Sequence, residues 1–248
     1  MASFEIAPQL QGQRIVVTGA ASGIGRATAL ALAGAGARLA LMDWDEAGLA
    51  QVASDAAPLT HRVDVGDEAS VDAAFDAVVR EWGGIDVLIN VAGIMRDQMA
   101  DIRNITLENW QRVLDVNLTG SFLTARAASR VMIPAGGGTI ILVGSPAGVT
   151  GASGSISYGS SKGGVNGLAM TLERHLGEHG IRVHNFCPGS VDTPLFNRSL
   201  DVGVANGAPQ SYADTARSNS VSPEGIGRAL ALLASPWASD LKGPIFTR

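Results

Sequence analysis

The sequence predicts a single-domain α/β protein, a doubly wound parallel sheet with helices on both faces. Short apolar runs alternate with longer helix-forming stretches along the whole chain, without a linker or a repeat. Alternation of this kind gives a parallel sheet that is covered on both faces. A glycine-rich turn also joins the first apolar run to the first helical stretch. The 248 residues fit one unit, because α/β folds of this size often form a single domain.

The expected elements follow from this alternation. We expect strands at 14–18, 37–42, 59–63, 85–90, 138–144, 181–187 and 244–247, and helices at 23–34, 45–55, 67–82, 106–133, 157–178 and 222–235. Asp67 and Thr106 are suitable helix N-caps, and Ser222 is a cap followed by a first-turn proline.

The first strand enters a phosphate-binding turn. The β-branched run Arg14–Val17 leads into Thr18–Gly25, which reads Thr-Gly-Ala-Ala-Ser-Gly-Ile-Gly and opens an Ala/Leu-rich helix. Glycines let the backbone approach a ligand closely, and free N–H groups at a helix start attract a pyrophosphate. The spacing is Gly-x-x-x-Gly-x-Gly rather than the commoner Gly-x-Gly-x-x-Gly. The alternative is an ordinary tight turn, but the flanking elements favour a Rossmann-like dinucleotide site.

The second strand ends at an acidic residue. Asp43 follows Gly25 by eighteen positions. A carboxylate about 20 residues after the glycines typically binds the adenosine ribose 2′-hydroxyl and repels a 2′-phosphate. The segment Gly19–Gly25 contains no Lys or Arg, and Trp44 follows Asp43. NAD is therefore favoured over NADP, with a solvated strand-end carboxylate as the alternative.

A tyrosine and a lysine share a helical spacing downstream. Tyr158 and Lys162 are four residues apart, so they lie on one face of the expected helix, and Ser145 ends the preceding strand. A phenol titrates near pKa ~10, so its use as a base near neutrality requires stabilisation of phenolate. A fixed cation supplies part of that, and a neighbouring hydroxyl can hydrogen-bond the reacting oxygen.

These motifs together resemble the core type of the short-chain dehydrogenase/reductase family, over nearly the whole chain. The resemblance is carried, in order, by the glycine motif Thr18–Gly25, Asp64-Val65, Asn90-Val91-Ala92-Gly93, Asn117, Ser145 with Tyr158 and Lys162, and Pro188-Gly189-x-x-x-Thr193. It implies a catalytic set of Asn117, Ser145, Tyr158 and Lys162. It further implies cofactor contacts from Thr18, Gly19, Ser22, Gly23, Ile24, Gly25, Asp43, Asp64, Val65, Asn90, Ala92, Gly93, Tyr158, Lys162, Pro188, Gly189, Val191 and Thr193.

The resemblance also implies a role for each catalytic group. Tyr158 would exchange the substrate's hydroxyl proton, and Ser145 would position and polarise the substrate oxygen. Lys162 would lower the Tyr158 pKa and hold the nicotinamide ribose. Asn117 would keep a water that connects Lys162 to bulk solvent.

Two departures from the family pattern stand out. Val91 replaces the second Asn of the family's Asn-Asn-Ala-Gly signature, which removes one amide near the central strands. The carboxyl terminus, 242–248, lacks the common Asp-Gly-Gly ending. Because Pro244 cannot donate to a sheet ladder, we expect the last strand to be short and at an edge.

Composition bounds the class of protein. No apolar run reaches the ~18 residues of a membrane span, and Met1–Gln13 lacks the features of a signal peptide. One cysteine, Cys187, suits a reducing compartment, and we expect a cytoplasmic protein with this thiol packed in the core. A net charge of −5 argues against nucleic-acid binding. The four histidines show no metal-ligand spacing, so no metal is expected.

The substrate is less well defined. We expect the pocket walls at 94–103, 146–155 and the long segment 190–220, which lacks clear periodicity and suggests a mobile lid. Apolar residues of that segment favour a moderately hydrophobic alcohol or ketone, or simply pack the lid. Arg96 could meet a substrate carboxylate, but a solvated loop arginine is the favoured interpretation.

We therefore expect an NAD-dependent oxidoreductase that interconverts a secondary alcohol and a ketone. The alternatives are an NADPH-dependent 3-oxoacyl carrier-protein reductase and a non-catalytic NAD(H)-binding regulator, since fold alone does not give activity. Helices 106–133 and 157–178 carry more apolar residues than one core-facing stripe requires. A homotetramer is expected, as the resemblance also implies, with a dimer as the alternative because of the atypical carboxyl terminus.

Overall fold

In this computed structural model, residues 10–56 and 58–247 are described, and they contain one seven-stranded parallel sheet. The strand order is β3-β2-β1-β4-β5-β6-β7, so the chain reverses direction across the sheet between β1 and β4. The predicted fold class is confirmed. The strands are β1 (Arg14–Thr18), β2 (Arg38–Asp43), β3 (Leu59–Arg62), β4 (Val87–Asn90), β5 (Gly138–Val143), β6 (Ile181–Cys187) and β7 (Pro244–Phe246).

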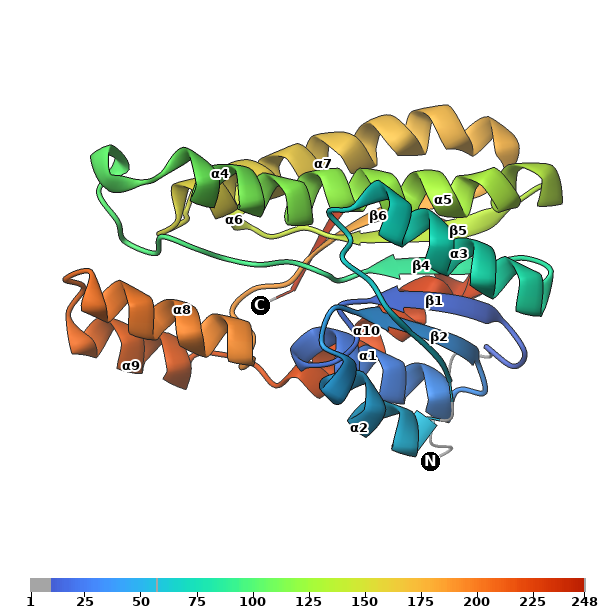
Figure 1. Cartoon of the computed structure of the whole chain (residues 1–248), viewed down its shortest axis with the longest axis horizontal. Coiled ribbons are helices and arrows are strands. Elements are labelled where there is room, and N and C mark those ends of the chain that lie inside the picture. The colour runs from blue at the N-terminus through green and yellow to red at the C-terminus, as the bar shows by residue number, and fades with distance from the viewer. Residues whose placement is uncertain (1–9, 57, 248) are drawn as a thin grey trace.

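Helices cover both faces of this sheet (Figure 1). One face carries α3 (Glu68–Trp82), α4 (Leu107–Leu114), α5 (Gly120–Ala135) and α7 (Ile156–Leu176). The other face carries α1 (Gly23–Gly34), α2 (Glu46–Ala56) and α10 (Pro223–Ala234). The strand arrows point toward the side where α8 (Pro194–Ala205) and α9 (Gln210–Ser218) lie (Figure 1). The short α6 (Ala147–Thr150) follows β5.

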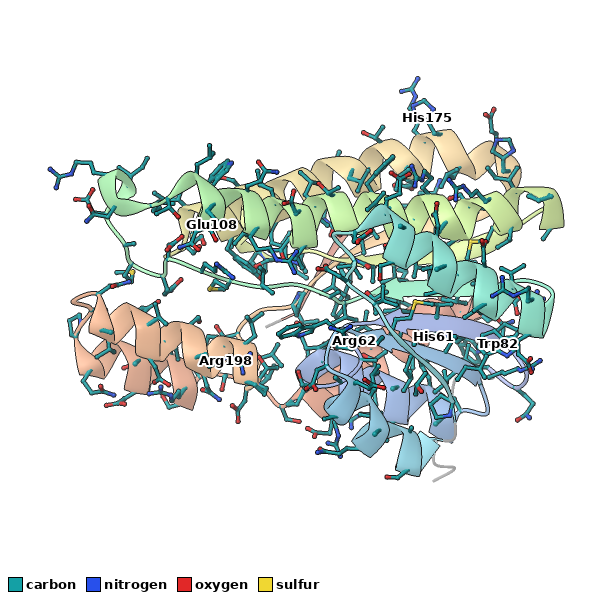
Figure 2. The ribbon with its side chains drawn as sticks, in the orientation of Figure 1. His61, Arg62, Trp82, Glu108, His175 and Arg198 are labelled. Atoms are coloured by element: carbon teal, nitrogen blue, oxygen red, sulfur yellow. The ribbon has the colours of Figure 1, made fainter. Side chains whose placement is uncertain are left out.

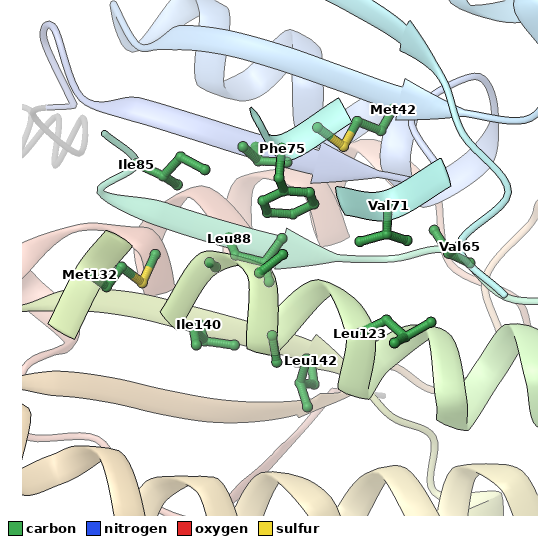
Figure 3. Close-up of a cluster of buried hydrophobic side chains, with 14 of the residues drawn as sticks. Met42, Val65, Val71, Phe75, Ile85, Leu88, Leu123, Met132, Ile140 and Leu142 are labelled. Carbon is green, nitrogen blue, oxygen red and sulfur yellow. The ribbon is translucent and has the colours of Figure 1, made fainter. Parts of the chain in front are cut away.

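The buried core is divided by the sheet into two clusters. The cluster beneath α3, α5 and α7 includes Phe75, Leu88, Met132 and Ile140, which are labelled in Figure 3. The opposite cluster lies beneath α1 and α10. Because strands of a doubly wound sheet are buried on both faces, they are apolar at nearly every position, and all four residues of β4 are buried.

The predicted helix starts are confirmed by their caps. Asp67 accepts hydrogen bonds from the N–H groups of Ala69 and Ser70, and Thr106 accepts from that of Asn109. The Ser222 hydroxyl accepts from the Glu224 N–H at the start of α10. Each cap satisfies an N–H that the helix itself leaves free.

Two elements differ from the sequence expectation. The helix expected at 106–133 is interrupted by a π-helical turn over Asp115–Thr119, between α4 and α5. The segment 190–220, which has no clear periodicity, folds into the helices α8 and α9. Both lie away from the sheet (Figure 1), so no single apolar stripe marks them in the sequence.

The ends of the chain bear on two further expectations. Strand β7 has three residues and lies at the sheet edge, as Pro244 predicts. Residues 1–9 of the segment Met1–Gln13, which was expected to lack the features of a signal peptide, lie outside the described residues. Arg248, in the atypical carboxyl-terminal segment, also lies outside them. Within 10–56 and 58–247, none of the helices combines the length and apolarity needed to cross a bilayer.

Candidate functional site

A cavity of about 440 Å³ lies at the carboxyl ends of the strands, and it brings most of the predicted site residues together. Open α/β sheets bind ligands at this end, where the strand order reverses. The predicted residues that line it are Gly19, Ser22, Gly23, Ile24, Gly25, Asp43, Asp64, Val65, Ala92, Gly93, Ser145, Tyr158, Lys162, Pro188, Gly189, Val191 and Thr193. Thr18, Asn90 and Asn117 are instead fully buried behind its wall.

The glycine turn forms a cradle that side chains would fill. Gly19 has a φ of +67°, and a Cβ there would lie 2.7 Å from the Ala92 nitrogen. A Cβ on Gly25 would lie 1.9 Å from the carbonyl oxygen of Gly19. Helix α1 begins at this turn, and its N-cap, Ser22, makes no side-chain cap hydrogen bond. The first N–H groups of α1 are thus left for an anion.

Asp43 is held at the end of β2 beside this turn. Its Oδ2 accepts a hydrogen bond from the Ala21 N–H at 3.0 Å, and its Oδ1 accepts one from the Asp45 N–H at 3.0 Å. A carboxylate has about four acceptor positions, so each oxygen keeps one for a ligand hydroxyl. Asp64, after β3, accepts from Gly66 and forms an ion pair with Arg112 at 2.9 Å.

A buried polar network joins β1 to β4 behind the cavity. The Thr18 hydroxyl donates to Asn90 Oδ1 at 2.8 Å and accepts from the Ala92 N–H at 3.3 Å. Asn90 Nδ2 donates to the Ser121 hydroxyl at 3.0 Å. Every one of these buried groups is satisfied, so the central strands are held although Val91, packed on the apolar core, supplies no second amide.

Asn117 occupies the π-helical turn and ties three segments together. Its Nδ2 donates to the carbonyl of Ile94 and to the hydroxyl of Ser161, both at 2.9 Å. Its Oδ1 accepts the Ile94 N–H at 2.8 Å. A π turn inserts one residue into a helix and is frequent at functional sites. Here it directs Asn117 toward α7 and the loop after β4.

Tyr158 and Lys162 lie together on α7, as their spacing predicts. Ser155 caps the helix by accepting the Tyr158 N–H at 3.2 Å. The Lys162 ammonium lies 5.7 Å from the centre of the Tyr158 ring and donates to the Val143 carbonyl at 2.6 Å. Tyr158, Lys162 and Ser145 all line the cavity.

Burial shifts the pKa values of both Tyr158 and Lys162. Burial raises the pKa of Tyr158 to about 12, and the hydrogen bond with Ser145 opposes this rise only in part. Burial also lowers the pKa of Lys162 to about 8, because the same apolar surroundings disfavour its charge. The lowering of the Tyr158 pKa by Lys162, which the resemblance implies, stays a prediction.

The chain is similar to known proteins along nearly all of its length. Residues 13–201 match the family model described as short chain dehydrogenase. The chain belongs to the short-chain dehydrogenase family. A D-threitol dehydrogenase of Mycolicibacterium smegmatis is 38% identical, over 95% of this chain and 90% of that protein. A cis-4-hydroxycyclohexanecarboxylate dehydrogenase of Sinomonas cyclohexanicum is 40% identical, over 93% of this chain and 92% of that protein.

A crystal structure of levodione reductase gives a TM-score of 0.88 at 30% identity, covering 96% of each chain. As a short-chain dehydrogenase, the protein is an oxidoreductase that binds a nicotinamide dinucleotide and acts on a small molecule. The described residues fit such a cofactor. The cradle at Gly19 and Gly25 would admit a pyrophosphate, and the open N-terminus of α1 would bind its charge.

The expected pocket walls contribute further residues to the cavity, from the loop after β4 and from α8. They include Met95, Leu195, Phe196 and Arg198, together with Trp44, which is 71% exposed at the other end. The sequence placed both segments at the pocket walls, and the structure decides which of their side chains line the cavity. Cys187 is fully buried, and burial raises the pKa of its thiol, in agreement with the packed thiol expected.

A second cavity, of about 280 Å³, lies at the opposite ends of the strands. Its lining includes three glycines and the charged residues Asp86 and Arg182. Asp86 is already paired with Arg14, and Arg182 Nη2 donates to the Thr139 hydroxyl at 2.8 Å. We place the reaction in the larger cavity because it holds Ser145, Tyr158 and Lys162.

Proposed function

We propose that this short-chain dehydrogenase catalyses NAD-linked interconversion of a secondary alcohol and a ketone. The observation that carries the proposal is the convergence of Ser145, Tyr158 and Lys162 on the cavity that also holds the glycine cradle. Support for NAD comes from Asp43, whose free acceptor positions face the same cavity. The nicotinamide would supply the hydride chemistry when bound.

The protein's own groups would handle the proton and the substrate oxygen. Tyr158 donates its phenolic proton to the ketone oxygen in reduction and accepts the alcohol proton in oxidation. Ser145 hydrogen-bonds the same oxygen. Lys162 holds its ammonium beside the phenol, and Asn117 fixes the loop at Ile94 against α7. The water expected at Asn117 and the ribose contact expected of Lys162 stay predictions.

The two alternatives are less well supported. A carrier-protein reductase using NADPH requires a cation near the 2′-phosphate, whereas Asp43 lies there and its carboxylate repels that group. A protein that only binds NAD(H) does not require a buried lysine beside a tyrosine, whereas Lys162 lies beside Tyr158 and is only 4% exposed. A panel of secondary alcohols, cyclic diols and hydroxy acids with NAD tests the proposal. No turnover of any of them would favour the binding protein.

The pKa of Tyr158 predicts different pH dependences for the rates of alcohol oxidation and ketone reduction. A phenol with a pKa of about 12 is protonated near neutrality, so it is ready to donate but must first lose its proton to act as a base. Initial rates of alcohol oxidation should therefore rise with pH between about 6 and about 9, whereas ketone reduction should not rise. Oxidation rates that stay flat over this range would contradict the assignment of Tyr158.

We also propose that the protein is a homo-oligomer, most simply a tetramer, with α5 and α7 at the main interface. Phe122 and Ile133 on α5 and Met170 on α7 are exposed, with Met170 55% accessible. Water penalises such apolar faces unless another subunit covers them. Exposed Trp237 and Phe246, near the carboxyl terminus, would serve the second contact.

Light scattering at micromolar concentration tests the assembly. We expect a mass well above the monomer's 25.4 kDa. Met170→Glu should lower that mass, because it places a charge in the covered face, whereas Val202→Glu on the lid helix α8 should not. A wild-type mass near 25.4 kDa would refute the assembly outright. The cytoplasmic location stays a prediction of the sequence.

A further inference from the structure

Two arginines line the substrate end of the cavity. Arg96 lies in the loop after β4, and Arg198 lies on α8, where Figure 2 labels it. The two carboxylates of the lining, Asp43 and Asp64, follow β2 and β3, on the other side of β1 from Ser145. The substrate end therefore carries these two arginines in addition to the Lys162 ammonium beside Tyr158, and none of the carboxylates that line the cavity.

Neither of these arginines is neutralised by direct contact with an acid among the described residues. Arg96 Nη1 donates to Asn109 Oδ1, a neutral amide, at 2.6 Å. Asn109 in turn donates to Asp97 at 2.9 Å, so one amide separates Arg96 from that carboxylate. The Arg198 side chain makes no hydrogen bond or ion pair within 10–56 and 58–247. By contrast Arg112, at the other end of the cavity, is paired with Asp64.

Arg96 is also fixed relative to the reacting groups. Its carbonyl accepts a hydrogen bond from the Ser155 hydroxyl at 2.6 Å, and the same hydroxyl accepts the Tyr158 N–H at 3.2 Å. One side chain thus links the backbone of Arg96 to the first turn of the helix that bears Tyr158. Arg198 approaches from the opposite wall, on the helix that follows Thr193.

We propose that the substrate alcohol or ketone carries an anionic group, a carboxylate or a phosphate, that Arg96 and Arg198 bind. The inference rests on the proposed function and names its substrate class. The planar guanidinium matches both anions and hydrogen-bonds them in a bidentate manner. A cleft lined by one sign of charge also concentrates the field at its mouth and raises the local concentration of an oppositely charged substrate. Arg96 is exposed in the loop after β4, as the interpretation of a solvated loop arginine expects, and this exposure leaves its guanidinium accessible to a substrate anion.

One competing role concerns Arg198. Helix α8 begins beside the glycine turn, since a Cβ on Gly23 would lie 3.0 Å from Thr193. An arginine one turn later would then bind the cofactor pyrophosphate instead of the substrate. The Kd for NADH, measured in the absence of substrate, separates the two roles, because the loss of a substrate contact leaves it unchanged.

The test compares matched pairs of acid and neutral substrate. The pairs are cis-4-hydroxycyclohexanecarboxylate with its methyl ester, and glycerol 3-phosphate with glycerol, each assayed with NAD. Wild-type kcat/KM should favour the anionic member of at least one pair, and the pair that responds distinguishes carboxylate from phosphate. Arg96→Gln and Arg198→Gln should each lower kcat/KM for that anion by about 10- to 100-fold. The neutral member should change by less than about threefold.

Arg174→Gln is the matched control, since it removes one positive charge from α7 at an exposed position outside the cavity. The variant should leave kcat/KM unchanged for both members of each substrate pair. Equal losses on the anionic and neutral members, or a preference for the neutral members, would overturn the inference while leaving the alcohol dehydrogenase proposal intact. An Arg198→Gln effect confined to the Kd for NADH would overturn the part assigned to Arg198.

A binding measurement keeps the inference testable without turnover. Calorimetric titration of the NADH-loaded protein with cyclohexanecarboxylate should show binding that Arg96→Gln and Arg198→Gln weaken by about tenfold or more. Its methyl ester should bind equally to the wild type and to both variants. Binding of the acid without turnover of any alcohol would support the anion site and count against the proposed reaction. Turnover of neutral alcohols without binding of the acid would overturn the anion site and support the proposed reaction.

Discussion

Replacing Tyr158 by phenylalanine is expected to lower turnover by about 10²- to 10⁴-fold, because the reaction loses the group that exchanges the proton. The change removes one oxygen and keeps the ring that packs beside Lys162, so the fold and the cavity should persist. NADH binding, measured by fluorescence titration, should be nearly unchanged. Steady-state rates with a secondary alcohol and NAD give the comparison.

The chain offers a matched control, since its only other tyrosine is Tyr212. That residue is exposed on α9 and does not line the cavity. Tyr212→Phe should leave turnover and NADH binding unchanged. Substantial turnover in Tyr158→Phe with the true substrate would remove Tyr158 from the mechanism, and a loss of NADH binding would point to a structural role instead.

Exchanging the charge at the end of β2 is expected to change the cofactor preference. In Asp43→Ala with Trp44→Arg, the carboxylate that would bind the ribose hydroxyls and repel a 2′-phosphate is lost, and a cation is added. Each change is worth roughly 1.5–3 kcal/mol, so the ratio of kcat/KM for NADP to that for NAD should rise by two orders of magnitude or more. Trp44 is exposed at the cavity, so the replacement does not disturb the core.

Glu46→Ala controls for the loss of a negative charge nearby, because Glu46 is exposed in the first turn of α2. It should leave the NADP-to-NAD ratio as in the wild type. A wild-type protein that already prefers NADP would show that the function assigned to Asp43 is wrong. The double variant also loses the hydrogen bond from Ala21, so its thermal stability should be measured alongside.

The sequence predicted the elements well where a local signal exists. Strand β6 and helix α1 were predicted with the bounds they have, because an apolar run and a glycine turn mark them. The helix caps Asp67, Thr106 and Ser222 were also predicted, because Asp, Thr and Ser are typical N-cap residues. In the structure each accepts hydrogen bonds from N–H groups two or three residues farther along the chain. The helices α8 and α9 within 190–220 were not predicted, because they lie away from the sheet and carry no single apolar stripe that faces the core.

The site was predicted as a set of residues but not as an electrostatic environment. Ser145, Tyr158 and Lys162 meet as their spacing and strand positions indicate. A sequence shows that a lysine is near Tyr158 but not how strongly burial acts on the two groups, and burial raises the pKa of Tyr158 and lowers that of Lys162. The π turn at Asn117 was likewise hidden, since a helix with one inserted residue keeps an ordinary helical composition.

The sequence by itself thus determined the doubly wound sheet, the glycine cradle, and the placing of Asp43, Ser145 and Tyr158 at strand or helix ends. These follow from local patterns and from the rule that parallel strands share one carboxyl edge. The sequence also placed 94–103 and 190–220 at the pocket walls, but only the tertiary structure decided that the side chains of Arg96 and Arg198 are the ones that line the cavity, and that the carboxylates of its lining lie at the other end. Such a charge distribution depends on distances in space, and no spacing along the chain encodes them.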